Sequence, residues 1–595
     1  MEALAKAVVM LLAVSSAYLQ ATEYHVSVTG SDQSNGSRSS PFKTISAAAR
    51  VAQPGDTVTV HEGVYRERVN PPRGGESDKK RIVYQAASGE KVVIKGSEII
   101  KDWKRQQGDT WKVTLPNSFF GNFNPYKDII KGEWHRHAGY PRHTGTVYVN
   151  GTWMNEAKKE NQVTGPVGEA PFWIATVGKD TTTIWAQFKG IDPNAETVEI
   201  NVRQSVFYPD KQGRNYITVR GFTMRHAATP WAGAMSEQVG LIGTHWSKGW
   251  IIENNIISHS MNTGITLGRY DLVKHHGVRK PAESAPGYVK SCELALKNGW
   301  SKAKIGSHVV RNNHISHCEK NGIHGSLGGI FSIIENNVIC DIAMRGWIRG
   351  FDIAGLKLLA SNDTIIRNNH IYRCRGHGGV WLDWMAQGTR MTGNLLHDNS
   401  NDLYIEVNHG PSLIDNNLFL SRKAIRDWSQ GGGYAHNLIA GALESRGEKR
   451  QTPYFKPHTM KEMELSNIHY RDVRYHNNII VGGKGLSVYA KGGKLQESGN
   501  VHLKSAGIRV EQASDGVWVS VPQDPAWAGQ KRAVVTTELL GKAKIPDAPF
   551  VNPDGTPYRL DTDYFGKKRN ARWPAPGPFQ PSAGSRVRVW PKDLR

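Results

Sequence analysis

The chain has 595 residues, of which 38% are hydrophobic, and its 75 basic and 53 acidic residues give a formal net charge of +22. Its 62 Gly, 18 Trp and 20 Tyr, and its shortage of long helix-forming runs, favour many short strands joined by turns, so we expect an all-β protein. Beyond the N-terminal segment no stretch approaches the ~20 apolar residues of a membrane span. The basic residues are scattered and carry no nucleic-acid-binding signature. We therefore expect neither a membrane nor a nucleic-acid partner. The alternative is that the positive charge binds an acidic polysaccharide or an anionic envelope surface.

Residues 1–21 resemble a secretory signal peptide, with Lys6, an apolar stretch from Ala7 to Val14 and small residues up to Ala21. A buried N-terminal helix is the alternative. This segment predicts a periplasmic or extracellular protein. The four cysteines form no Cys-x-x-Cys pair, so we expect packed structural thiols, with a disulfide as the alternative after export, and neither a metal site nor a cofactor.

Residues 22–101 are predicted to form an N-terminal cap and the first coils of a solenoid. Pro41 to Ala52 is rich in Ala and has Thr44 as its candidate N-cap, which predicts a short helix before the strand Thr57 to His61. Such a helix would cover the open end of the sheets and protect it from edge pairing.

Residues 102–208 differ from the rest of the chain because longer segments of alternating polarity replace the repeat described below. The Asn150-Gly151 pair inside Thr146 to Trp153 is a hairpin signal, and together with Thr181 to Phe188 it predicts an inserted β-sandwich. A second interruption near 270–304 contains a predicted helix at Tyr288 to Asn298. Long loops of this kind are natural walls for a cleft.

Residues 209–545 carry an internal repeat of short apolar runs that contain Asn or Asn-Asn. Steps of 24, 32, 25 and 23 residues separate successive repeats between 313 and 417, a coil of about two dozen residues. Coils of this length with several short strands predict a parallel β-helix with Asn ladders at its bends, since the Leu pattern of a leucine-rich repeat is missing. The last Asn of each run is residue 255, 313, 337, 369, 394, 417 or 478. Beyond the repeat, residues 546–595 are predicted to be a tail packed on the β-helix.

Two carboxylates occupy the same position in consecutive coils. Val380 to Trp384 and Leu403 to Val407 are offset by 23 residues, as are the Asn residues that follow them. Side chains alternate along a strand, so Asp383 and Glu406 should both face outward. Coils about 4.8 Å apart would place them near the 5 to 5.5 Å separation of retaining glycosidases rather than the ~6.5 to 9.5 Å of inverting ones.

Two stacked carboxylates repel, which raises the pKa of one and leaves the other ionised, as acid and nucleophile chemistry requires. Solvated surface charges, or a divalent cation site, are the alternatives. Trp381 and Tyr404 share the outward column and are candidates for stacking on sugar rings, whereas alternation points Trp384 into the core. Spacing alone does not say which carboxylate plays which role.

The segments Gly379–Arg390 and Asp402–Pro411 closely resemble the β-xylosidases of glycoside hydrolase family 120. The resemblance implies a right-handed β-helix bearing a jelly-roll-like domain, Asp383 as nucleophile, Glu406 as general acid/base, and release of xylose from the non-reducing end of xylo-oligosaccharides. It also implies self-association as a homo-oligomer. Supporting matches are Thr57–Tyr65, Asn298–Lys302, Asp427–Gly432, Thr452–Tyr454 and Lys456–His458.

Further substrate contacts are predicted for residues in the outward column or beside the two motifs, with solvation or turn stabilisation as the alternative for each. Rival functions are a polysaccharide lyase or polyuronate hydrolase on the same fold, and a non-catalytic glycan-binding β-helix. The column favours the hydrolase because it shows paired carboxylates with aromatic residues. The further candidates are His324, Asp352, Lys357, Arg390, Asn408 and His409.

Overall fold

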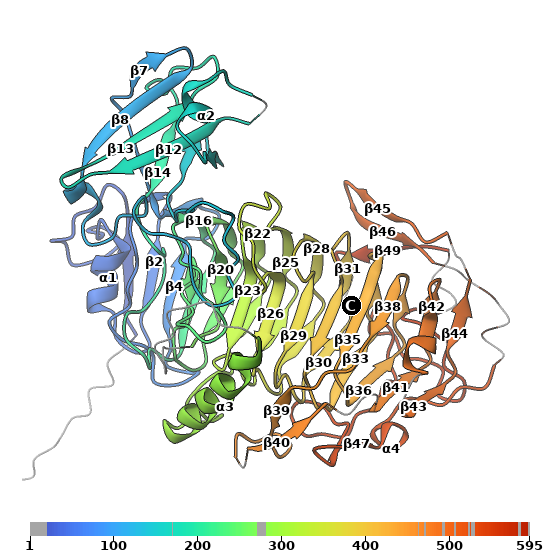
Figure 1. Cartoon of the computed structure of the whole chain (residues 1–595). Helices are drawn as coiled ribbons and strands as arrows, with labels where there is room; N and C mark the ends of the chain where they lie inside the picture. The colour runs from blue at the N-terminus through green and yellow to red at the C-terminus, as the bar shows by residue number, and fades with distance from the viewer. Residues whose placement is uncertain are drawn as a thin grey trace, which may run out of the picture.

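The computed structural model describes residues 21–592, apart from 169, 270–280, 462, 469–471, 491–493, 505–506, 522–523, 525–526, 528–529 and 581–584. The described chain is a right-handed parallel β-helix with a β-sandwich inserted near its N-terminal end (Figure 1). Apart from Ala21, the expected signal peptide lies outside the described residues. None of the helices in the described part has the length and apolar character that crossing a membrane requires.

Three sheets run along the β-helix, and all strand pairs within them are parallel. Among the described residues the first sheet has thirteen strands. They are β1 (Glu23–Val26), β2 (Thr57–Val60), β4 (Ile82–Ala86), β15 (Ile217–Arg220), β18 (Ile251–Glu253), β21 (Val309–Arg311), β24 (Ile333–Glu335), β27 (Ile365–Arg367), β30 (Arg390–Thr392), β33 (Ser412–Asp415), β36 (Gly432–Ala435), β41 (Asp472–His476) and β43 (Lys494–Ser498).

The second and third sheets contribute the other two sides of each coil. The second contains β3 (Gly63–Tyr65), β5 (Val92–Lys95), β16 (Thr223–Ala227), β19 (Ile256–Ser260), β22 (His314–Cys318), β25 (Val338–Ile342), β28 (His370–Cys374), β31 (Leu395–His397), β34 (Leu418–Phe419), β37 (Leu438–Ile439), β42 (Ile479–Val481) and β44 (Val501–Leu503). The third contains β17 (Ile242–Gly243), β20 (Thr263–Thr266), β23 (Asn321–Ser326), β26 (Ala354–Leu359), β29 (Val380–Asp383), β32 (Leu403–Glu406), β35 (Lys423–Trp428) and β38 (Ala442–Ser445).

The apolar runs of the repeat build the interior. The middle residue of each short strand in the first sheet points inward, and the register stacks Ile252 on Val310, Ile334 and Ile366 in successive coils. These side chains are fully buried in one continuous core. Burying a side chain of this size contributes roughly 1.5 to 3 kcal/mol, so the column of aliphatic residues holds the coils together.

An asparagine ladder follows the first sheet at one bend, as the repeat predicts. The Asn394 amide nitrogen donates to Asn417 Oδ1 at 2.9 Å and to the Ile366 carbonyl at 2.9 Å, and equivalent bonds link the ladder from coil to coil. The preceding residue adopts a left-handed conformation, for example Asn416 with φ 54°, which explains the Asn-Asn pairs. The ladder members are Asn255, Asn313, Asn337, Asn369, Asn394, Asn417, Asn437, Asn478 and Asn500.

Helix α1 (Ile45–Val51) closes the N-terminal end of the β-helix. The Thr44 side chain accepts a hydrogen bond from the Ala47 amide, which confirms the predicted N-cap. Ile45 and Ala48 are buried in the same core as the strands. The helix therefore covers apolar surface that the first coil would otherwise expose.

The inserted sandwich consists of two sheets around its own apolar core. Strands β9 and β10 form the predicted hairpin, with positive φ at Asn150 and Gly151. One sheet contains β6 (Ser97–Ile99), β9 (Val147–Val149), β10 (Thr152–Trp153) and β14 (Val198–Asn201). The other contains β7 (Lys104–Gln107), β8 (Thr110–Pro116), β11 (Asn155–Glu156), β12 (Phe172–Val177) and β13 (Thr181–Gln187), and the short helices are η1 (Asn117–Phe120) and α2 (Asn161–Thr164).

Helix α3 (Pro281–Lys297) lies beside the third sheet and is longer at its N-terminal end than the expected 288–298 (Figure 1).

The four cysteines are free and buried, as expected of structural thiols. C-terminal elements pack along the β-helix, where Tyr564 and Val589 join Leu418 in one apolar cluster. These elements and the neighbouring loops contain β39 (Gln451–Tyr454), β40 (Glu464–Asn467), η2 (Gly485–Tyr489), β45 (Val510–Ala513), β46 (Gly516–Ser520), α4 (Thr537–Leu540), β47 (Lys542–Ala543), β48 (Ala548–Pro549) and β49 (Arg586–Trp590).

Candidate active site

A cavity of about 460 Å³ lies over the third sheet, between the sandwich and the segment that follows β38. Its volume falls in the range of small-molecule sites, roughly 300 to 1,000 Å³. Its lining combines aromatic and charged side chains. The lining residues are Trp134, Tyr288, Phe351, Asp352, Lys357, His377, Trp381, Asp383, Trp384, Tyr404, Glu406, Arg426, Trp428, Arg446, Glu448 and Arg450.

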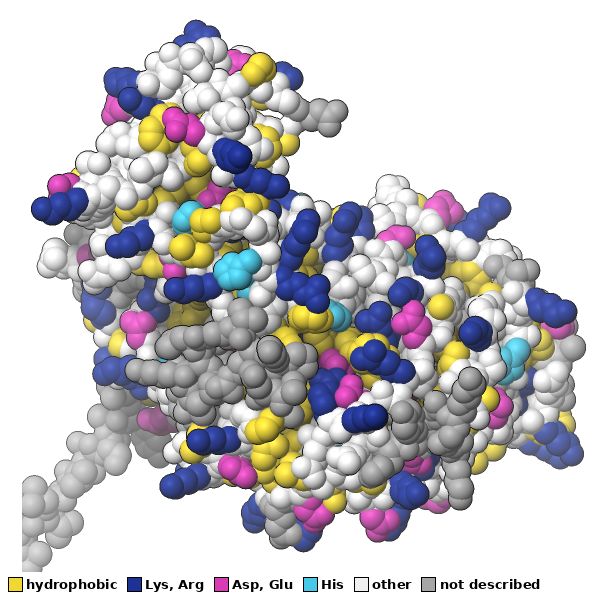
Figure 2. All heavy atoms as spheres, in the orientation of Figure 1, with side chains coloured by type: hydrophobic (Ala, Val, Ile, Leu, Met, Phe, Trp, Pro, Cys, Tyr) yellow, Lys and Arg dark blue, Asp and Glu magenta, His cyan; other side chains and the backbone are white. Residues whose placement is uncertain are grey.

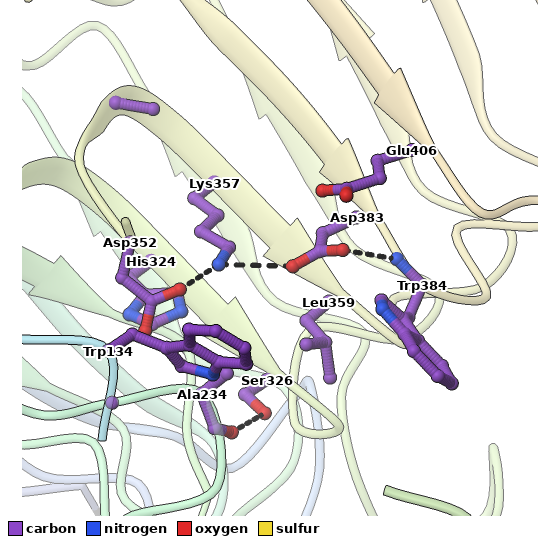
Figure 3. A network of polar contacts seen from close by, with 12 residues as sticks. Trp134, Ala234, His324, Ser326, Asp352, Lys357, Leu359, Asp383, Trp384 and Glu406 are labelled. Atoms are coloured by element: carbon purple, nitrogen blue, oxygen red, sulfur yellow. Dashed lines mark hydrogen bonds and ion pairs between the residues drawn. The ribbon is translucent and has the colours of Figure 1, made fainter. Parts of the chain in front are cut away.

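Asp383 and Glu406 end the adjacent strands β29 and β32. The register pairs Trp381 with Tyr404 and Leu382 with Ile405, so the two carboxylates follow at equivalent positions. Leu382 faces the interior, as alternation predicts, and both carboxylates face the cavity. Figure 3 shows the two carboxyl groups extending from neighbouring strands toward the same space. Both are buried, which rules out solvated surface charges as their explanation.

One lysine links Asp383 to a second carboxylate. Lys357 lies on β26, one coil before Asp383, and its Nζ is 3.0 Å from Asp383 Oδ2 (Figure 3). The same ammonium donates to Asp352 Oδ1, and Asp383 Oδ1 accepts from the Trp384 amide at 2.9 Å. These contacts hold the Asp383 carboxylate in one orientation.

An arginine plays the equivalent part at Glu406. The Arg450 guanidinium donates to Glu406 Oε1 and, at 2.8 Å, to Glu448 Oε2. Burial of the Tyr404 hydroxyl, together with the neighbouring Glu406 charge, raises the pKa of Tyr404, so this phenol stays protonated. Each carboxylate of the pair therefore shares one cation with a further carboxylate.

The pKa of the Asp383 carboxyl group is strongly raised. Burial raises the pKa of Asp383 to about 7; the Lys357 ammonium opposes this rise and the Glu406 carboxylate adds to it. Burial also tends to raise the pKa of Asp352, but Lys357 and Lys320 overcome it and hold that pKa below its usual value. Asp352 therefore stays charged and orients Lys357, whereas the Asp383 carboxyl group takes up a proton near neutral pH.

Aromatic rings form the wall beside the carboxylates. Trp381 and Tyr404 stack with ring centroids 5.1 Å apart, and the Lys357 Nζ lies 3.8 Å from the Trp381 ring. His377 stacks on Trp381 at 4.2 Å, and burial lowers the pKa of His377 to about 3, which keeps the imidazole neutral. Flat apolar rings beside polar groups suit the faces and hydroxyls of a sugar.

Two insertions close the cavity near Asp352. Trp134, from the loop of the sandwich domain, donates its Nε1 hydrogen to the Tyr288 hydroxyl of α3 at 3.0 Å.

The expectation that Trp384 points into the β-helix core is wrong. Strand β29 ends at Asp383, so alternation does not extend to Trp384, which packs 4.9 Å from Tyr288 in a separate apolar cluster and lines the cavity.

Among the other predicted substrate contacts, Asp352, Lys357, Trp381 and Tyr404 line the cavity. His324 does not line the cavity. It is fully buried, with its Nδ1 3.3 Å from Lys320 Nζ, so the alternative prediction of a solvated side chain is also wrong.

Arg390 lies in the first sheet and binds Asp415, with 2.9 Å between Arg390 Nε and Asp415 Oδ2, which corrects its expected contact with substrate. The reason is that Arg390 begins the strand after the bend and so faces a different side of the β-helix.

Asn408 and His409 brace the bend behind Glu406. Asn408 Nδ2 donates to the Leu382 carbonyl at 3.0 Å, while Asn408 Oδ1 accepts from the Ala386 amide. His409 is hydrogen-bonded to the Thr452 carbonyl at 3.1 Å. Neither side chain lines the cavity, so the turn-stabilising alternative describes them better than substrate contact.

Several cavity residues were missed by the sequence reasoning. Arg426 pairs with Tyr404 and Trp428 with Glu406 in the register of β35, so extending the coil alignment by one strand would have found both. The cavity residues from loops and insertions follow no repeat and gave no signal. In the described part of the chain, no group of three or more His, Cys, Asp or Glu side chains is placed to hold a metal ion.

Three family models match parts of the chain. Residues 100–200 match the family model described as glycoside hydrolase 120, insertion domain. Residues 296–433 match that of the periplasmic copper-binding protein NosD, and residues 28–71 match a domain of unknown function, DUF1565.

Two relatives define the extent of the similarity. Over 75 residues the chain is 37% identical to the uncharacterized protein YwoF of Bacillus subtilis (strain 168), a match covering only 13% of this chain and 16% of that protein. The structure of XylC in complex with xylose is similar along nearly the whole chain, with 39% sequence identity, a TM-score of 0.89, and coverage of 96% of this chain and 100% of that one. The chain thus belongs to glycoside hydrolase family 120.

Proposed function

We propose that the protein is a retaining, exo-acting β-xylosidase that releases xylose from the non-reducing end of xylo-oligosaccharides. The observation that carries the proposal is the pair Asp383 and Glu406, which comes from adjacent coils and faces one cavity. Coils in a parallel sheet are about 4.8 Å apart, a spacing that suits a direct nucleophile better than the wider gap that an intervening water needs. The choice of xylose rests on the 39% identical XylC, whose structure contains this sugar.

In the first step the Asp383 carboxylate attacks the anomeric carbon while Glu406 gives its proton to the leaving oxygen, so that a glycosyl ester forms and the glycosidic bond breaks. In the second step Glu406 takes a proton from water, which displaces Asp383 and releases the sugar with its original anomeric configuration. Lys357 and the Trp384 amide keep the attacking carboxylate oriented. Burial alone would favour Asp383 as the protonated member, so the division of roles rests on the family resemblance.

The closed end of the cavity supports exo action. Trp134 and Tyr288 meet across this end, near Asp352, so one sugar unit rather than a continuing chain fits beyond Asp383. One oxygen of each carboxylate in the pair is already bound to a cationic side chain, Asp383 Oδ2 to Lys357 and Glu406 Oε1 to Arg450, which favours hydrolysis over the calcium-assisted lyase alternative. We further propose that the enzyme acts outside the cytoplasm, as the N-terminal segment suggests.

The roles can be separated with aryl β-xylosides that carry good or poor leaving groups. Asp383→Ala should lose activity on both by several orders of magnitude, because no covalent intermediate forms. Glu406→Gln should lose about 10² to 10⁴-fold on the poor leaving group but much less on the good one, and azide should restore turnover as a β-xylosyl azide. Asp180→Asn, an exposed change in the sandwich, is the matched control.

Several outcomes would overturn the proposal. Rescue of the Asp383 variant by azide with formation of a β-azide, together with rescue of the Glu406 variant as an α-azide, would reverse the two roles. NMR of the first product would exclude retention if the released xylose had the inverted anomeric configuration. Higher activity on an α-arabinoside, β-glucoside or β-galactoside than on the β-xyloside would show that xylose is not the preferred sugar.

A further inference from the structure

The cations that line the cavity differ in their partners. Lys357, Arg426 and Arg450 each contact carboxylates of the protein, Arg426 through Glu444 at 3.3 Å. Arg446 also lines the cavity, is exposed, and has no carboxylate within ion-pair distance among the described residues. Arg446 is therefore the cavity cation whose charge is available to bind a negatively charged group of the substrate.

Arg446 is nevertheless held in place. Its guanidinium carbon lies 3.2 Å from the centre of the Trp428 ring, a cation–π contact that fixes the plane of the group. Arg446, Glu448 and Arg450 all line the cavity, whereas Lys449 between them does not. A guanidinium fixed by stacking keeps a planar fork of N–H donors, which matches a carboxylate better than a single hydroxyl.

The position of Arg446 relative to the reacting groups follows from the register. Lys357, Asp383 and Glu406 come from three successive strands, and Trp428 pairs with Glu406 in the next one. Trp428 therefore lies one coil, about 4.8 Å, beyond the proposed acid/base. The closed end of the cavity is on the opposite side, near Asp352, so the leaving group extends toward Trp428 and Arg446.

We propose that Arg446, stacked on Trp428, binds the carboxylate of a uronosyl group carried on the leaving-group side of the substrate. This inference rests on the proposed function and names its substrate class: acidic, uronate-substituted xylo-oligosaccharides. It also gives a local use to part of the net charge of +22, although the basic residues as a whole are scattered among acidic ones over the visible face (Figure 2).

The test compares two probes that differ only in charge. One is a xylo-oligosaccharide with a glucuronosyl substituent on the xylose next to the non-reducing end; the other is the same molecule with that carboxyl group reduced to an alcohol. The native enzyme should show a higher kcat/KM for the acidic probe. Arg446→Gln should lower kcat/KM for the acidic probe by about 10- to 100-fold, as loss of a charge-assisted hydrogen bond does, and leave the reduced probe within about twofold.

Arg559→Gln, an exposed arginine outside the cavity, removes the same charge and should change neither value. Arg446→Lys should retain only part of the preference, because an ammonium lacks the planar fork. Equal losses on both probes, or no preference by the native enzyme, would overturn the inference while leaving the proposed function intact. Failure of the native enzyme to release xylose from either probe and from xylobiose would overturn the proposed function itself.

Discussion

Lys357 and Asp383 are joined across adjacent coils, with 3.0 Å between the ammonium nitrogen and the carboxylate Oδ2. Lys357→Met removes the cation that favours the ionised Asp383 carboxylate. We expect kcat/KM to fall by about 10² to 10³-fold, the size typical of losing one electrostatic contact to a reacting group. Steady-state kinetics with an aryl β-xyloside measures this loss. Lys449→Met, an exposed change nearby, should have little effect; unchanged kinetics in Lys357→Met would show that the ammonium does not support the nucleophile.

The activity should depend on pH through Asp383. As the proposed nucleophile this carboxyl group must be ionised, and its pKa is raised to about 7. As pH falls through about 7 the carboxylate takes up a proton and can no longer attack the anomeric carbon, so kcat/KM should decline.

In Lys357→Met the same decline should move to higher pH, because without the ammonium the carboxyl group holds its proton more tightly. Profiles of kcat/KM from about pH 4 to about pH 9 on a substrate with a good leaving group check both statements. A decline that stays in place, or that moves to lower pH, would contradict this account of Asp383.

Trp134 should set the length of the released product. Trp134→Ala opens the end of the cavity that Trp134 closes with Tyr288, so we expect xylobiose to appear beside xylose and KM for xylobiose to rise about tenfold, the loss expected from one aromatic contact. Chromatography of products from xylohexaose measures it. Tyr288→Phe keeps the ring and loses the hydrogen-bonding hydroxyl, and it should still release xylose alone. An unchanged product pattern in Trp134→Ala would mean that another feature sets the exo mode.

The asparagine ladder should contribute to stability rather than to chemistry. Asn417→Ala removes the side-chain acceptor of the buried Asn394 backbone amide and a side-chain donor to the Met391 carbonyl, which should lower the free energy of unfolding by about 1 to 3 kcal/mol. Urea or thermal unfolding measures the change. Asn298→Ala, at an exposed position, is the control. Loss of turnover in folded Asn417→Ala enzyme would show that the ladder has a second role.

Much of the β-helix is readable from the sequence because its cause is local and repeated. The spacing of the Asn runs predicts the coils, and alternation predicts which of Leu382, Asp383, Ile405 and Glu406 face the core or the cavity. The prediction fails at Trp384 because the strand stops one residue earlier, and at Arg390 because the chain turns a corner before it. Asn437 was not recognised as a ladder member since the residue before it is His436 rather than Asn.

The solenoid, the shared column of the two carboxylates and, through the likeness of two motifs, the family can all be predicted from the order of the amino acids. The surroundings of the carboxylate pair cannot, because they depend on tertiary packing. Arg450, Trp134 and Tyr288 come from a loop, the inserted sandwich and α3, which obey no common period, and their contacts join residues far apart in the chain. A repeat fixes the position of each side chain relative to the next coil, whereas contacts between insertions depend on how separate parts of the chain pack together.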